Sequence, residues 1–285
     1  MRRAVTIFAL MLALSASGCK SLSRYFAYED APDTIKAAQV DPRLQLTRQL
    51  GERWSPIIRN MAAKHGRLHY ANGLEDHLRS ILKPLDIIVV RSRPALTRIA
   101  FPSHFTHAEI WLGSEHELRS LGVYNAGYFT PMRADVAAGK TIFEAADDDV
   151  HLSPFRSMTN VDEILILRPQ GLTLASMHAK YRGLAGLVGE PFDYNFDYGD
   201  TSRLTCMEVV KQTYSEASIP VRYTTGRYTV IPDDIARRGL VAGSSLRLVA
   251  YVKPEGFDGY RLASAVEAEA AITEPAAKPK YARRY

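Results

Sequence analysis

The sequence lacks several features that would mark a specialised class of protein. It has only two cysteines, one of them in an expected processing site, so we expect no disulfide within the chain. No repeat with a period of about 20–50 residues is visible, which argues against solenoids and propellers. With 46% hydrophobic residues, 18 glycines and 15 prolines, the chain has the composition of neither a disordered, a collagenous nor a polytopic membrane protein. We therefore expect it to fold around a sizeable core.

A large excess of charge is also absent. The formal net charge is +5, and loss of Arg2 and Arg3 with an expected leader would leave 34 basic and 31 acidic residues, about +3. The basic residues form no stripe interleaved with aromatic residues, and no nucleic-acid motif is present. No nucleic-acid partner is therefore expected.

The N-terminus has the pattern of a bacterial secretory leader. A short basic region precedes an apolar run over residues 4–14, and small residues then lead to Cys19. We expect residues 1–18 to be a signal peptide with a lipobox ending at Cys19, the lipidation site, although Ala16 replaces the usual Leu. Lys20 after the cysteine implies an outer-membrane lipoprotein of the bacterial cell envelope, facing the periplasm and held to the membrane by lipid chains. Plain secretion is the alternative.

The remaining chain divides into four segments. We predict a tether at 19–41, a helical accessory segment at 42–83, a main domain at 84–252 and a partly disordered C-terminal tail at 253–285. Within them, periodicity predicts helices at 42–64, 72–82, 172–187 and 206–217, and strands at 86–90, 107–112, 141–146, 163–167 and 246–252. Because the strands cluster between helices and do not alternate strictly with them, the predicted fold class is α+β.

Cys206 lies in a strong helix-start signal. Thr205-Cys206-Met207-Glu208 has the T-x-x-E pattern of a capping box, in which the Thr hydroxyl accepts from the Glu amide and the Glu carboxylate reaches back. This register places Cys206 at the first helical position, where unpaired amides and the helix dipole stabilise a thiolate. The pattern favours a nucleophile over a lone buried thiol.

A cysteine nucleophile needs a base, and His107 is the best placed of eight histidines. It begins the strand 107–112, whose alternation puts His107, Glu109 and Trp111 on one face. An imidazole at the rim of a sheet can meet a helix terminus that carries Cys206. His104-x-x-His107 and His65-x-x-x-His69 supply no recognisable third or fourth ligand, so no metal and no cofactor are expected.

The order of several short motifs resembles a known family. The motifs are Leu85-Asp86-Ile87-Ile88, Thr106-His107-Ala108-Glu109-Ile110-Trp111-Leu112-Gly113, Phe143-Glu144-Ala145, Gly189-Glu190-Pro191-Phe192-Asp193 and Thr205-Cys206-Met207-Glu208-Val209-Val210. In this order they resemble the circularly permuted papain-like hydrolases of the NlpC type, in particular the YiiX/YebB-like branch, over roughly residues 84–252.

The resemblance implies both a fold and a reaction. The implied fold is a permuted papain-like one, an antiparallel sheet packed against helices, here with an N-terminal helical accessory layer. The implied site has Cys206 as nucleophile, His107 as general base and acid, and Glu144 as the group that orients the imidazole. With the leader, this predicts a lipid-anchored periplasmic cysteine hydrolase that cleaves amide bonds, with peptidoglycan peptides as its substrate. An acyltransferase or lipid hydrolase and a non-catalytic wall-binding lipoprotein are the alternatives.

Four further residues are candidates for substrate binding: Asp193, Tyr194, Thr205 and Glu109. Asp193, with Asp197 in the same aromatic loop, could recognise a free amino group or could be a turn residue. Glu109 stands where the family has Gly or a small residue, and either replaces Glu144 as the orienting group or crowds the site. The segment 114–140 is either a lid or a surface excursion.

Overall fold

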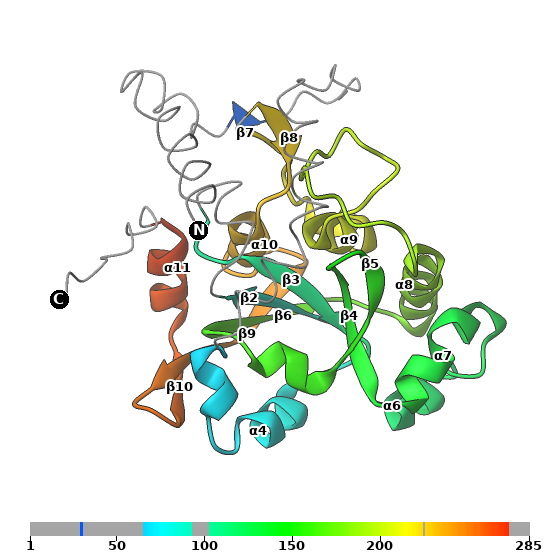
Figure 1. Ribbon diagram of the computed structural model, residues 1–285, viewed down its shortest axis with the longest axis horizontal. Coiled ribbons are helices and arrows are strands. Elements are labelled where there is room, and N and C mark those ends of the chain that lie inside the picture. Colours follow the sequence, from blue (N-terminus) through cyan, green and yellow to red (C-terminus); the bar gives the residue numbers. More distant parts are fainter. Residues whose placement is uncertain (1–28, 31–64, 93–102, 225, 274–285) are drawn as a thin grey trace, which may run out of the picture.

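The computed structural model describes residues 29–30, 65–92, 103–224 and 226–273, which form a mixed α+β fold (Figure 1). Its centre is a seven-stranded antiparallel sheet of order β10-β9-β6-β2-β3-β4-β5. The strands are β2 (Asp86–Arg91), β3 (His107–Trp111), β4 (Lys140–Ala146), β5 (Asp149–Pro154), β6 (Glu163–Pro169), β9 (Leu246–Glu255) and β10 (Gly259–Ala263). The predicted fold class is confirmed, and each predicted strand is present.

Helices cover both faces of this sheet. One face carries α8 (Leu174–Leu187), α9 (Cys206–Thr213) and α10 (Pro232–Arg238), while α4 (Leu74–Ile81) lies on the other (Figure 1). Alternation along β2 divides its side chains between two apolar clusters, because Ile87 and Val89 join the helix-rich face and Ile88 and Val90 the opposite one. A strand buried on both faces is consistent with the unbroken apolar run in the sequence.

The predicted helices lie near their expected bounds. The one expected at 72–82 is α4, that at 172–187 is α8, and that at 206–217 is α9 followed by a short 3-10 helix, Ser215–Ala217. The helix expected at 42–64 lies outside the described residues. Short 3-10 helices at Arg67–Tyr70 and Phe155–Thr159 pack beside α4 over the second apolar cluster.

The segment 114–140 is neither a lid nor a surface excursion. It forms α6 (Glu115–Ser120), a 3-10 turn (Gly127–Phe129) and α7 (Thr130–Ala137). Leu118, Phe129 and Met132 are completely buried in the larger apolar cluster. The two expectations are wrong because this segment is a layer of the core.

The folded part also continues past residue 252. Strand β10 pairs with β9, and α11 (Ala265–Thr273) follows, with Ala268 and Ile272 buried against the larger cluster. Within the predicted tail at 253–285, residues up to 273 belong to the folded part, so the predicted end of the main domain at 252 is wrong. Ala268 and Ile272 are four residues apart, so they form a narrow apolar stripe that the Ala- and Glu-rich composition conceals. Residues 274–285 lie outside the described part.

A second, small sheet stands apart from the first. It has the order β1-β7-β8 and is formed by β1 (Glu29–Asp30), β7 (Arg222–Thr224) and β8 (Arg227–Thr229). Two residues of the predicted tether therefore pair with the main domain, Glu29 opposite Tyr223 and Asp30 opposite Arg222. Among the described residues no helix is both long and apolar enough to cross a membrane.

Candidate active site

The start of α9 has the capping box that its sequence predicts. The Thr205 hydroxyl accepts from the Glu208 amide at 3.3 Å, and the Thr205 amide donates to the Glu208 carboxylate at 2.6 Å. Cys206 is the first residue of the helix, and it is 1% exposed, with its Sγ 3.0 Å from Met207 Sδ. Thr205 is itself buried. Its hydroxyl holds the helix start, and a substrate contact by Thr205 stays a prediction.

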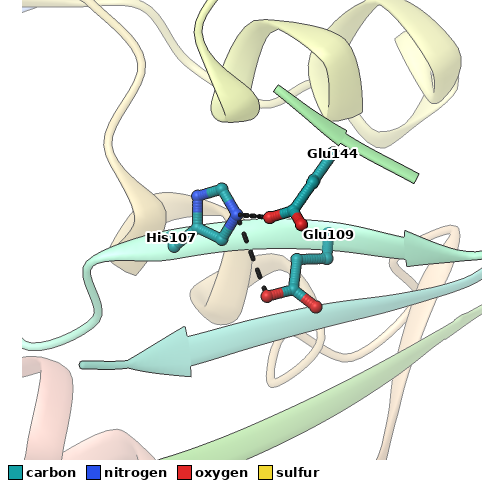
Figure 2. A group of neighbouring side chains, drawn as sticks. All are labelled: His107, Glu109 and Glu144. Carbon is teal, nitrogen blue, oxygen red and sulfur yellow. Dashed lines mark hydrogen bonds and ion pairs between the residues drawn. The ribbon is translucent and has the colours of Figure 1, made fainter. Parts of the chain in front are cut away.

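His107 and Glu144 meet on neighbouring strands. His107 begins β3, and Glu144 lies in β4, the strand that pairs with β3. Nε2 of His107 lies 2.7 Å from Oε2 of Glu144 (Figure 2). A contact this short is a charge-assisted hydrogen bond when the imidazole is protonated. Because it occupies Nε2, Nδ1 is the ring nitrogen left for a thiol.

The charges around His107 favour its protonated form. Burial lowers the pKa of His107, but the charge of the Cys206 thiolate, a hydrogen bond with Cys206 and the contact with Glu144 outweigh it, so the pKa lies well above its ordinary value. Burial likewise raises the pKa of Glu144, and the hydrogen bond and charge of His107 bring it below the ordinary range. The structure therefore joins Cys206, His107 and Glu144 electrostatically.

Glu109 is the third member of the cluster in Figure 2. Its Oε1 lies 3.8 Å from His107 Nε2, longer than a hydrogen bond. Burial, and next the charge of Glu144, raise the pKa of Glu109 to about 8, against the opposing effect of His107. Glu109 is thus protonated at neutral pH, and the short contact to the imidazole belongs to Glu144. Glu109 is buried like Cys206, at 4% exposure, and a substrate contact by Glu109 stays a prediction.

His151 is a neighbour that the sequence analysis missed. It lies opposite Glu144 in the β4–β5 pair, with Nε2 4.0 Å from Glu144 Oε1 and Nδ1 2.9 Å from Asp149 Oδ1. The charge of His151 is one of the effects that lower the pKa of Glu144. The alternation of buried Val150 and Leu152 around His151 was the available signal for β5.

The aromatic loop places Asp193 and Tyr194 in structural roles. Asp193 is fully buried, and its carboxylate accepts from the amides of Asn195 at 2.8 Å and Asp197 at 2.6 Å. It is a turn residue, so direct recognition of a substrate amine by Asp193 does not fit this structure. The Tyr194 hydroxyl donates to the carbonyl of Asp147 in the β4–β5 turn. Tyr194 therefore ties the loop to the edge of the sheet while its ring remains partly exposed.

Comparison with known proteins agrees with this geometry. The sequence model of one family, described as permuted papain-like amidase enzymes, YaeF/YiiX, C92 family, matches residues 82–251. That match covers more than half of the chain and includes Cys206, His107 and Glu144. No curated protein and no solved structure matches the chain.

Proposed function

The chain belongs to the permuted papain-like amidase family, and from this premise we propose that it cleaves amide bonds with Cys206 as nucleophile. His107 acts as the general base and acid, and Glu144 orients and charges the imidazole. The observation that supports this proposal is the 2.7 Å contact between His107 Nε2 and Glu144, which leaves the other ring nitrogen, Nδ1, for the thiol. Hydrolysis by a cysteine nucleophile uses these three groups: a thiol, an imidazole and a polar group that orients the imidazole.

The proposed reaction has two steps, and His107 carries the proton in each. The Cys206 thiolate attacks the amide carbonyl carbon, forming a C–S bond, and His107 Nδ1–H protonates the nitrogen as the C–N bond breaks. Water then attacks the thioester, giving its proton to His107, and the carboxylic acid leaves as the thiolate reforms. The backbone amide of Cys206, at the first helical position, is the natural donor to the oxyanion. Glu144 stabilises the imidazolium in both half-reactions.

The proposed substrate is a peptide of peptidoglycan. This rests on the leader at residues 1–18 and the lipobox at Cys19, which would tether the enzyme to the outer membrane beside that polymer. Subcellular fractionation tests the location. Wild-type protein should sediment with outer membranes, whereas Cys19→Ser should lose the lipid anchor, and equal membrane association of both would contradict anchoring at Cys19.

A second candidate is a binding protein without turnover, and the burial of Cys206 favours it. A thiol that is 1% exposed reaches a substrate only after side chains around it move. The reactivity of Cys206 separates the two candidates, because binding alone needs no thiolate.

Alkylation by iodoacetamide is the direct test. In a Cys19→Ser background Cys206 is the only thiol, so incorporated label reports it alone. We expect rapid labelling at pH 7 and much slower labelling in His107→Ala. His116→Ala, at an exposed position of α6, is the matched control and should behave as the parent protein. An inert thiol, or equal rates in His107→Ala and the parent, would overturn the catalytic proposal.

A product assay then identifies the bond. Peptidoglycan peptides and phospholipid vesicles are incubated in parallel with the parent protein and with Cys206→Ala, and products are identified by mass spectrometry. New amines from the peptides that require Cys206 support the amidase. Released fatty acid or acyl transfer from the vesicles would instead identify a lipid-acting enzyme.

A further inference from the structure

Glu109 is a buried acid with no use in the proposed reaction. Its side chain is 5% exposed, and its Oε2 has no hydrogen-bond partner among the described residues. Such an oxygen bears the full cost of leaving water. Its other oxygen points to His107 Nε2 at a distance too long for a hydrogen bond. The Glu109 carboxyl group therefore lies beside His107 and Glu144 without forming a hydrogen bond to either (Figure 2).

The cluster has the dimensions of a metal site. One ligand atom each from His107, Glu109 and Glu144 lie within 4.8 Å of one another. The separations from Nε2 are 2.7 Å to Glu144 and 3.8 Å to Glu109. A tetrahedral Zn²⁺ with bonds of about 2.0–2.1 Å holds its ligand atoms about 3.4 Å apart, so the two observed separations bracket that spacing. Small side-chain rotations would complete the geometry.

We propose that His107 Nε2 and the carboxylates of Glu109 and Glu144 bind one divalent transition-metal ion of the Zn²⁺ type. The imidazole nitrogen selects such an ion over Mg²⁺ and Ca²⁺, which prefer oxygen ligands alone. Glu109 gives up its proton to solvent when the ion binds, and the two buried carboxylates then supply the charge that neutralises the ion. Water supplies the fourth ligand from the side of His107, whose side chain is 20% exposed.

Occupation of this site inhibits the thiol chemistry; this part rests on the proposed function. A metal on Nε2 replaces its contact with Glu144, and the remaining proton of the ring then sits on Nδ1. With both nitrogens occupied, His107 accepts no proton from Cys206. The ion thus separates the imidazole from the carboxylate that activates it, which makes the site a point of reversible regulation.

Calorimetric titration with zinc chloride tests binding without reference to turnover. The protein is the full chain in a Cys19→Ser, Cys206→Ala background, which removes both thiols. We expect one ion per chain. Because loss of even an outer-shell partner typically costs about 10- to 100-fold in metal affinity, Glu109→Gln should weaken binding by at least that much. The isosteric amide preserves the shape of the side chain.

A surface control is needed because His65 and His69 stack with ring centroids 3.9 Å apart and could hold zinc adventitiously. A His65→Ala, His69→Ala double variant should keep the one-to-one binding. Absence of binding, undiminished affinity in Glu109→Gln, or loss of binding only in the double variant would overturn the site.

The regulatory part is tested separately, by the rate of Cys206 alkylation with and without zinc in the Cys19→Ser protein. Zinc should slow labelling, and Glu109→Gln should require at least about tenfold more zinc for the same effect. Substitution of Co²⁺ controls for direct binding to the thiol, which would produce a sulfur-to-cobalt charge-transfer band. Such a band, or equal zinc sensitivity in both proteins, would overturn regulation through this cluster even where the enzyme is active.

Discussion

Replacing Glu144 by Gln should sharply reduce the protonation of His107. The contact between them is a buried 2.7 Å hydrogen bond to a charged partner, and such bonds contribute about 1.5–3 kcal/mol. Since about 1.4 kcal/mol is a factor of ten, the ratio of imidazolium to neutral imidazole should fall about 10- to 100-fold at any given pH. The pKa of His107 therefore moves down, toward its ordinary value.

Ionisation of Glu109 should offset part of the decrease in the pKa of His107 in Glu144→Gln. Burial, followed by the charge of Glu144, raises the pKa of Glu109 to about 8. When residue 144 is neutral, the second of these causes disappears, so Glu109 ionises more easily 3.8 Å from Nε2. We expect a partial loss of imidazolium in Glu144→Gln and a larger loss in Glu144→Gln, Glu109→Gln. The two substitutions are therefore not additive.

Nuclear magnetic resonance titration of the His107 ring measures this directly. Glu163→Gln is a matched control, because Glu163 holds the only other short His–Glu contact of 3.0 Å or less among the described residues, to His104 Nε2 at 2.9 Å. It should change the signals of His104 and leave those of His107 in place. A change of less than about threefold in the His107 ratio, or a double variant no different from Glu144→Gln, would refute the assigned electrostatics.

Three further predictions concern stability. Burial opposes ionisation of Glu163, but its hydrogen bonds with His104 and Tyr251 bring its pKa to about 2, from 4.5. Ionised Glu163 therefore contributes on the order of 3 kcal/mol to the stability of the fold above pH 4.5, and this contribution is lost as pH falls toward 2. In urea titrations, the difference in unfolding free energy between wild type and Glu163→Gln should shrink over that range. Thr205→Ala removes the cap of α9 and should cost about 1 kcal/mol in the same assay, with an unchanged value contradicting the capping role. Gly66→Ala would put a Cβ 2.3 Å from the Val161 carbonyl carbon and should lower the unfolding free energy by about 1–3 kcal/mol. The control is Gly183→Ala, at an exposed position of α8 where the added Cβ meets nothing within 4 Å, and it should raise the unfolding free energy by about 0.5–1 kcal/mol. Both are measured by thermal unfolding, and equal effects would refute the close approach at Gly66.

Local patterns were enough to predict much of this molecule. The unbroken apolar run of β2, the alternation of β3 and the T-x-x-E pattern at Thr205 each depend on neighbouring residues, and each element is present. The position of Cys206 at a helix start follows from the same local signal. Ala268 and Ile272 escaped prediction because it is packing against α10 and β9, outside the helix itself, that makes their short apolar stripe a buried face.

The relation among the acidic residues was decided by tertiary structure. Alternation placed Glu109 on the face of His107, but the sequence contains no distance, and the pairing of β3 with β4 brings Glu144 to 2.7 Å while Glu109 stays at 3.8 Å. The protonation of Glu109 follows from its burial beside a second carboxylate. Asp193 likewise became a turn residue only because its loop folds inward over its own amides. The sequence determined which groups are available for chemistry, whereas burial and the pairing of strands determined which of them are charged and in contact, since both depend on residues far apart in the chain.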